Sequence, residues 1–229
     1  MKPGLTTLIA GLLSAVTANA RNPEPLRARE TDPPPAHPVR RVVLVHGFLE
    51  TGSAFSLMKR RLEKQGVQCL VAKLRPSDGR GGLDKLAEGL KRDIDATYGP
   101  DQPISVIGFS MGGVVSRYYL QKLGGAERCE KFFTISSPHH GTLAAKIYPS
   151  KGAAQMRPDS DFLKDLAETD ASLGTMPVVS YRTPLDLIIL PPSSSVWDRA
   201  VNIEHPALLH PLMVTSNTVI SDIEKRLLQ

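Results

Sequence analysis

Short apolar runs alternate with amphipathic stretches along the chain from Arg40 onward. The β-branched run VVLV is typical of a strand buried on both faces. Strands that alternate with helices predict one α/β domain over residues 40–229, with a mostly parallel, doubly wound sheet and helices on both of its faces. The apolar runs predict strands at about 42–45, 68–74, 104–109, 132–136, 178–182 and 201–203, and apolar residues three to four positions apart predict helices at about 53–65, 83–94, 111–123, 161–168 and 219–228.

Residues 143–176 interrupt this alternation. The segment contains Pro149, Pro158 and one clear helical pattern at 161–168. Ligands bind beyond the carboxyl ends of parallel strands, so an insertion that follows a strand falls at the rim of the ligand crevice. Two interpretations remain open, a small cap that contacts substrate and a plain crossover connection.

The beginning of the chain has a different pattern. A positive start precedes an apolar stretch at 5–18, and an A-x-A cleavage signature ends at Ala20. We therefore expect residues 1–20 to be a secretory signal peptide, and the mature chain to start at Arg21 and to be periplasmic or secreted. Residues 21–39 carry six prolines among scattered charges, which predicts an extended, solvated linker.

Composition excludes several classes of protein. The chain has 229 residues, of which 41% are apolar and 22% are charged, as in globular proteins. No apolar run reaches the ~18 residues that a membrane-spanning helix needs. The net charge of +5 is spread along the chain and only 5% of residues are aromatic, whereas nucleic-acid-binding proteins concentrate Lys and Arg on one stripe. The two cysteines lack zinc-ligand spacing, so we expect no metal and no other cofactor.

The strongest chemical signal is the sequence GFSMG, a G-x-S-x-G motif centred on Ser110. It lies between the predicted strand at 104–109 and the predicted helix at 111–123, which is the strand–turn–helix context that this motif requires. The turn strains the backbone of the serine and exposes its hydroxyl, and Gly108 and Gly112 leave room for the adjacent strand and helix. We predict that Ser110 is a nucleophile; the alternative is a structural turn.

A serine nucleophile needs a base, a group that orients the base, and N–H donors for the oxyanion that forms on attack. His46-Gly47-Phe48 follows the first predicted strand directly, in the position of a loop that supplies one such donor. We assign the oxyanion donors to the backbone N–H groups of Phe48 and Met111. Met111 begins a helix, where N–H groups are free and the helix dipole favours negative charge.

These motifs resemble the α/β-hydrolase superfamily, and more closely its small bacterial secreted lipases and esterases, which are triacylglycerol lipase-like. The resemblance covers about residues 40–228 and rests on VVLVHGF, IGFSMGG, ISSPHHGT, and the later segments PLD and HPALL. Nothing before Arg40 is similar to the two leading strands of larger members. The resemblance therefore implies a compact α/β-hydrolase of about six mostly parallel strands.

The superfamily order is serine, then acid, then histidine. Asp186 follows the predicted strand at 178–182, where the acid is expected, and the aliphatic run and prolines after it match the family pattern. The resemblance therefore implies that Asp186 is the acid. Without the resemblance, Asp198 and Glu204 are open alternatives.

Two histidines late in the chain are candidates for the base. The resemblance favours His205, because HPALL is similar to the family's histidine followed three and four residues later by two aliphatic residues. His210 is the alternative. The resemblance gives His139 and His140 a shaping role beside the serine rather than a catalytic one.

The resulting hypothesis is an exported carboxylic-ester hydrolase, a lipase or esterase, that uses a Ser110-Asp186-His205 triad and an acyl-enzyme intermediate. The alternatives are an acyltransferase with an alcohol acceptor and a non-catalytic lipid-binding relative. The expected partner is a small-molecule or lipid ester, with no nucleic acid and no obligate protein partner. The basic helix predicted at 53–65 allows a transient contact with a lipid surface. In the superfamily's strand order Cys69 and Cys129 lie on strands that are not neighbours, so we expect two free, buried thiols.

Overall fold

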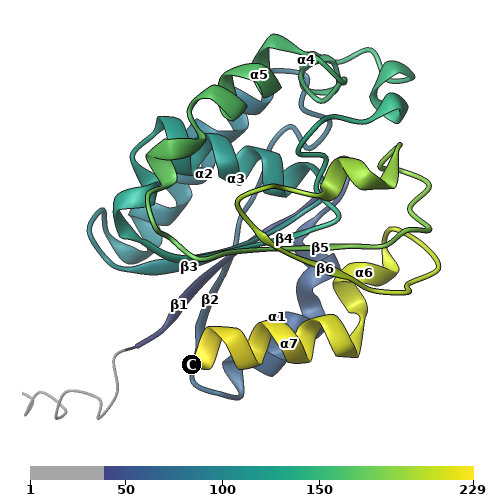
Figure 1. The fold of residues 1–229 in the computed structure, drawn as a ribbon. Helices are drawn as coiled ribbons and strands as arrows, with labels where there is room; N and C mark the ends of the chain where they lie inside the picture. Colours follow the sequence, from purple (N-terminus) through teal and green to yellow (C-terminus); the bar gives the residue numbers. More distant parts are fainter. Residues whose placement is uncertain (1–38) are drawn as a thin grey trace, which may run out of the picture. The chain divides into compact units, whose positions relative to one another are not determined.

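One parallel sheet of six strands organises residues 39–229, the part of the chain that the computed structural model describes. The strand order is β2-β1-β3-β4-β5-β6, and every neighbouring pair is parallel (Figure 1). The prediction of about six mostly parallel strands is confirmed. The predicted signal peptide, and all of the predicted linker except Val39, lie outside the described residues. The strands are β1 Arg41–Val45, β2 Gln68–Val71, β3 Ile104–Phe109, β4 Cys129–Ile135, β5 Val178–Arg182 and β6 Val201–Glu204.

The chain reverses its direction of strand addition at β1, which lies between β2 and β3. At such a switch point the loops after the two central strands turn toward opposite faces of the sheet and leave a crevice between them. The predicted motif at 46–48 directly follows β1, and Ser110 directly follows β3. The topology therefore brings both motifs to the same crevice.

Helices cover both faces of the sheet (Figure 1). Alternate residues of β1 supply both cores: Val43 and Val45 pack into the cluster shared with α2, α3 and α5, whereas Val42 and Leu44 pack into the cluster shared with α1, α6 and α7. The predicted helices on both faces are thus confirmed. The helices are α1 Ser56–Glu63, α2 Leu83–Tyr98, α3 Met111–Lys122, α4 Lys151–Gln155, α5 Asp161–Glu168, α6 Leu212–Thr215 and α7 Asn217–Leu228.

Element ends differ from the predictions where polar residues obscure the pattern. β4 begins three residues before the predicted Phe132, because exposed Glu130 breaks the apolar run although its backbone is already in the strand. The predicted helix at 53–65 is a 3-10 turn, Gly52–Phe55, followed by α1.

The two cysteines lie on strands that are three places apart in the sheet, β2 and β4. Both are free thiols, as expected. Cys129 is buried but Cys69 is only half-buried, so the expectation of two buried thiols is half right. Burial raises the pKa of each thiol to about 12, which makes both poor nucleophiles at neutral pH.

Two of the basic side chains of α1 make hydrogen bonds or ion pairs within the fold. Arg61 donates hydrogen bonds to Glu224 and Ser221 of α7, and Lys59 pairs with Glu63 on its own helix. Arg61 therefore joins α1 to α7, whereas Lys59 is paired within α1. No helix in the described part of the chain has the length and apolar character to cross a bilayer.

Candidate active site

Ser110 occupies the sharp turn between β3 and α3. Its φ of 53° and ψ of −126° lie in a region that residues other than glycine rarely adopt, so the turn is strained. The Ser110 N–H donates to the carbonyl of Ile135 at 2.8 Å, which ties the turn to the end of β4. The strained turn predicted from the G-x-S-x-G motif is therefore present, but Ser110 is buried, whereas the motif predicted an exposed hydroxyl.

The glycines of the motif allow the helix to approach the sheet. A Cβ on Gly112 would lie 2.1 Å from the carbonyl oxygen of Val45, and a Cβ on Gly108 would lie 2.5 Å from the Cα of Gly113. Both distances are far below van der Waals contact. Glycine at 112 therefore lets the N-terminus of α3 lie directly against the end of β1, and glycine at 108 lets it lie against β3.

The loop after β1 lies beside the serine. A Cβ on Gly47 would lie 3.1 Å from the Cβ of Ser110 on one side and 2.8 Å from Oε2 of Glu50 on the other. The Gly47 N–H donates to that same oxygen at 2.9 Å, and the Leu49 N–H donates to the carbonyl of Ser77 at 2.9 Å. These contacts hold the backbone that carries Phe48 next to Ser110. The oxyanion roles of Phe48 and Met111 stay predictions.

Asp186 is buried in the loop that follows β5 and is fully engaged. Its Oδ1 accepts hydrogen bonds from the N–H groups of Ile188 and Ile189 at 2.9 and 2.8 Å. Its Oδ2 lies 2.8 Å from Nδ1 of His210, which is also buried. The His210 ring packs on Phe109, the residue before Ser110, with 4.9 Å between ring centroids.

The environment keeps Asp186 ionised. Burial alone raises the pKa of this carboxyl, but the hydrogen bonds and charge of His210 and the two amides outweigh burial, so the pKa lies below its usual value of 3.8. An ionised carboxylate only accepts hydrogen bonds. Nδ1 of His210 therefore carries the proton, and its Nε2 is left as the basic atom.

The structure corrects the predicted partner of Asp186, which is His210 and not His205. The His205 N–H donates to the carbonyl of Arg182 at 2.8 Å, so His205 still belongs to the β5–β6 ladder. Its ring lies 3.1 Å from the hydroxyl of Ser216, the residue that caps α7. Five residues later the chain has left the sheet and turned back over β5, which brings His210 to the acid. Local similarity of HPALL to the family pattern could not reveal this turn.

The other candidate acids and histidines lie elsewhere. Glu204 pairs with Arg182, and Asp198 is exposed. His139 is buried, lies 3.0 Å from the Thr134 hydroxyl and stacks on Trp197. Burial and the nearby charge of Arg117 hold the pKa of His139 well below 6.5, so its ring is a neutral part of the core.

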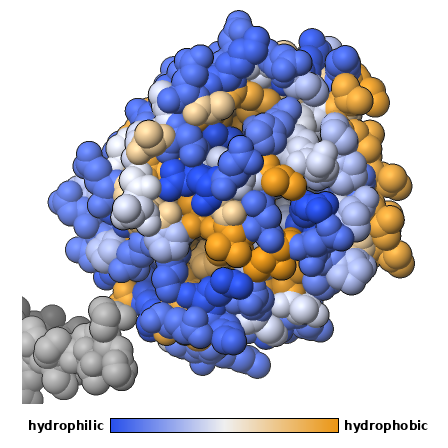
Figure 2. Space-filling model, viewed as in Figure 1, coloured by the Kyte–Doolittle hydropathy of each residue, from blue (hydrophilic) through white to orange (hydrophobic). Residues whose placement is uncertain are grey.

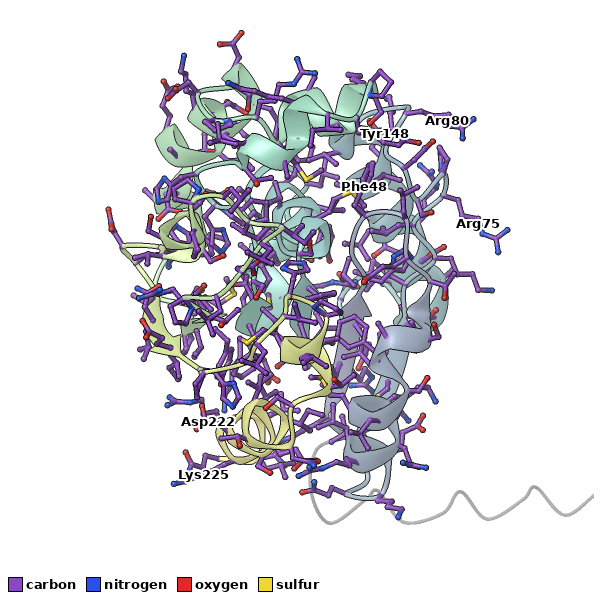
Figure 3. All side chains as sticks on the ribbon, turned by 90° about the vertical axis from the view of Figure 1, so that its right-hand side faces the viewer. Phe48, Arg75, Arg80, Tyr148, Asp222 and Lys225 are labelled. Carbon is purple, nitrogen blue, oxygen red and sulfur yellow. The ribbon has the colours of Figure 1, made fainter. Side chains whose placement is uncertain are left out.

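An apolar cavity of about 90 Å³ opens at Ser110. Phe48 and Tyr148 both line it and their rings are in contact, with 4.9 Å between the ring centroids and an edge-to-face angle of 82° (Figure 3). The structure supports the cap interpretation for the first part of the insertion, which lines the cavity, whereas α5 further along packs on α3 as a crossover helix does. The lining residues are Phe48, Ser110, Pro138, Thr142, Ala144, Ala145, Tyr148, Ala153, Met156, Ile188 and Ile189.

Exposed apolar side chains gather at the same end of the molecule. Ten large apolar residues are exposed in the described part of the chain, and all but Val201 lie in segments that follow β1, β4, β5 or β6. Figure 2 shows apolar surface along the right-hand edge, where the strands of Figure 1 reach their carboxyl ends. This apolar rim consists of Leu49, Leu143, Ile147, Leu185, Leu187, Ile188, Leu208, Leu209 and Leu212.

Two residues of the site were not singled out from the sequence. Glu50 supports Gly47, and the Thr142 hydroxyl joins the insertion to the acid loop by donating to the carbonyl of Ile188 and accepting from Leu190 N–H. An acidic residue in a short apolar loop was the available signal for Glu50. Thr142 ends the motif ISSPHHGT, but nothing in the sequence indicates its contacts with the acid loop. Among the described residues, no group of three or more His, Cys, Asp or Glu side chains could hold a metal ion.

Comparisons with solved structures find the same fold in other proteins. The mature form of Bacillus licheniformis lipase BlEst2 superposes with a TM-score of 0.69 at 16% identity, over 85% of this chain and 94% of that one. Aspergillus fumigatus lipase B superposes with a TM-score of 0.63 at 14% identity, over 77% of this chain and 49% of that one. The ydeN gene product of B. subtilis superposes with a TM-score of 0.61 at 14% identity, over 83% of this chain and 99% of that one. At these identities the likeness is one of fold.

Sequence comparisons agree with the fold. A comparison with curated proteins gave no match. The family defined by the alpha/beta hydrolase fold matches residues 40–206, which contain β1 to β6, the turn at Ser110 and Asp186. The chain belongs to the alpha/beta hydrolase fold family.

Proposed function

We propose that the protein is a serine hydrolase that cleaves carboxylic esters, with Ser110 as the nucleophile, His210 as the base and Asp186 as the residue that orients the base. The observation that carries this proposal is the 2.8 Å pairing of buried Asp186 with His210, whose ring packs on the residue before a strained serine. A serine hydroxyl becomes nucleophilic when a histidine with a buried acid partner can take its proton, and the contact of His210 with Phe109 supports that role here.

The reaction follows from these groups. Ser110 Oγ attacks the ester carbonyl carbon while Nε2 of His210 takes the hydroxyl proton, and Asp186 stabilises the resulting imidazolium. The N–H groups of Phe48 and Met111 receive the negative charge on the carbonyl oxygen. The carbon–oxygen bond to the alcohol then breaks, the alcohol leaves with the proton from His210, and an acyl-Ser110 remains. Water repeats the sequence and releases the acid.

The surroundings of Ser110 favour an apolar ester. The cavity beside the serine is lined almost entirely by apolar side chains, and the apolar rim, which shares Ile188 with this lining, lies at the same end of the molecule. Exposed apolar patches of this kind mark sites where ligands, proteins or membranes bind. We therefore propose that the ester is apolar and that the rim, rather than the basic face of α1, makes any transient contact with a lipid surface.

Hydrolysis of p-nitrophenyl butyrate tests the proposal. The wild-type chain should release p-nitrophenolate and butyrate, and Ser110→Ala should lose activity by on the order of 10⁶-fold, as in other serine hydrolases. The matched control is Ser193→Ala, which alters an exposed serine outside the cavity lining. Thermal unfolding should be similar for all three proteins. Activity that survives Ser110→Ala contradicts the proposed nucleophile.

A further inference from the structure

The cavity at Ser110 can be assigned to one side of the ester. It is lined by Ser110 and Phe48 but not by His210. The leaving alcohol must lie within reach of the histidine that protonates it. A pocket that touches the nucleophile and the proposed oxyanion loop but not the histidine therefore holds the acyl group.

The size of the cavity limits the acyl chain. An apolar cavity of about 150 Å³ holds benzene, with six carbon atoms. By proportion, the 90 Å³ cavity holds about four carbon atoms. A longer chain would have to displace the far wall or leave its end in water, and each methylene left unburied weakens the transfer of the chain into the pocket by about fourfold.

The far wall is anchored at several points. Met156 is buried, and its carbonyl accepts the Thr142 N–H at 2.8 Å. The Ser150 hydroxyl caps α4 and donates to the carbonyl of Asp78 at 2.9 Å, while the Gly152 N–H donates to Gly79. The wall therefore rests on a separate loop, the one that precedes α2, and resists displacement.

Tyr148 closes the side of the cavity nearest the surface. Its half-buried ring meets Phe48 edge to face, and the two rings join the insertion to the loop after β1 (Figure 3). Edge-to-face aromatic pairs stabilise such a contact beyond the area that they bury. The Tyr148 ring is thus a supported part of the cavity wall.

We propose that the acyl pocket accepts chains of up to four carbons, and that Tyr148 and Met156 set this limit. The preferred substrates are then esters of short acids, from acetate to butyrate. This inference rests on the proposed ester hydrolysis and specifies its substrate class.

The test compares kcat/KM on p-nitrophenyl acetate, butyrate and octanoate, all below their aggregation limits. The wild-type chain should prefer butyrate over octanoate at least tenfold. Tyr148→Ala and Met156→Ala should each raise the octanoate-to-butyrate ratio about tenfold, because each lengthens the cavity. Lys146→Ala, which removes an exposed side chain of the same segment outside the lining, should leave the ratio unchanged.

A filling variant tests the same pocket in the opposite direction. Ala144 lines the cavity but is only half-buried, so Ala144→Phe can fill the space without loss of core packing. This variant should lose butyrate hydrolysis at least tenfold relative to acetate. Equal kcat/KM on all three esters in the wild type, or ratios that none of the lining variants changes, would overturn the assignment of the pocket. Failure to hydrolyse any of the esters would instead reject the proposed function.

Discussion

The side chain of Asp186 accepts two backbone hydrogen bonds and pairs with His210. A replacement of the same shape therefore tests the role of its charge while its position is kept. Asp186→Asn keeps the size of the side chain but reverses the hydrogen bond that sets the tautomer of His210. We expect esterase activity to fall by on the order of 10⁴-fold with the fold retained. The measurement is kcat/KM beside thermal unfolding. Full activity would show that His210 is oriented by another group.

The same carboxyl makes a pH-dependent contribution to stability. Its pKa lies below 3.8 in the folded protein, so the unfolded chain binds the proton more tightly. The stabilisation is therefore present above the unfolded value of 3.8 and is lost as pH falls through the folded value. Urea unfolding of wild type and Asp186→Asn should give a difference that shrinks below about pH 3.8. A difference that grows with acid would contradict the lowered pKa.

Glu50 is a second carboxyl near the site whose pKa is shifted. Burial raises the pKa of Glu50 above 4.5, although the Gly47 N–H and the rings of His210 and His46 oppose the shift. When ionised, the Glu50 carboxylate places a negative charge near the proposed base. Glu50→Gln removes that charge, so the acid limb of the pH profile of kcat/KM should move to lower pH. Glu168→Gln, an exposed change on α5, should leave the profile in place. A shift toward higher pH would reject this role for Glu50.

At the scale of elements, the contact between α3 and β1 positions the nucleophile. Gly112→Ala would force a Cβ to within 2.1 Å of the Val45 carbonyl oxygen, a backbone atom that cannot rotate away. We expect this variant to lose about 3 kcal/mol of unfolding free energy or more. The matched control is Gly89→Ala on α2, where a Cβ meets only the end of Arg92 at 3.7 Å. That change should stabilise the protein by about 0.5–1 kcal/mol, because alanine favours the helix. Urea unfolding measures both; equal effects would contradict the tight packing.

The elements could be predicted largely from apolar periodicity, because a strand buried on both faces and an amphipathic helix leave distinct patterns. β3 and α5 begin and end where the pattern predicts. The position of a site residue follows from the apolar pattern when the residue directly follows a strand, as Ser110 follows β3. His210 could not be placed, because a loop that leaves the sheet and returns carries no periodicity. The contact of Tyr148 with Phe48 joins segments 100 positions apart and has no local signal.

At the scale of the whole molecule, export of the protein and cleavage after Ala20 stay predictions, because the family fold does not test them. Residues 1–20 have the charge, apolar core and A-x-A end of a signal peptide. Expression in a bacterial host should give exported protein whose N-terminal sequence starts Arg21-Asn22-Pro23. The measurement is Edman sequencing of protein from the periplasm and medium. Cytoplasmic protein that keeps the intact start of the chain would reject export.

Covalent labelling with a fluorophosphonate tests the proposed Ser110–His210–Asp186 unit most directly, because the reagent reacts only with an activated serine. Mass spectrometry should place the label on Ser110 in the wild type. His205→Ala should be labelled at nearly the wild-type rate, since its ring contacts Ser216 outside the unit. His210→Ala should be labelled slower by on the order of 10⁴-fold or more, because no base remains to take the hydroxyl proton. A label on another residue, or rapid labelling of His210→Ala beside slow labelling of His205→Ala, would contradict the proposed unit.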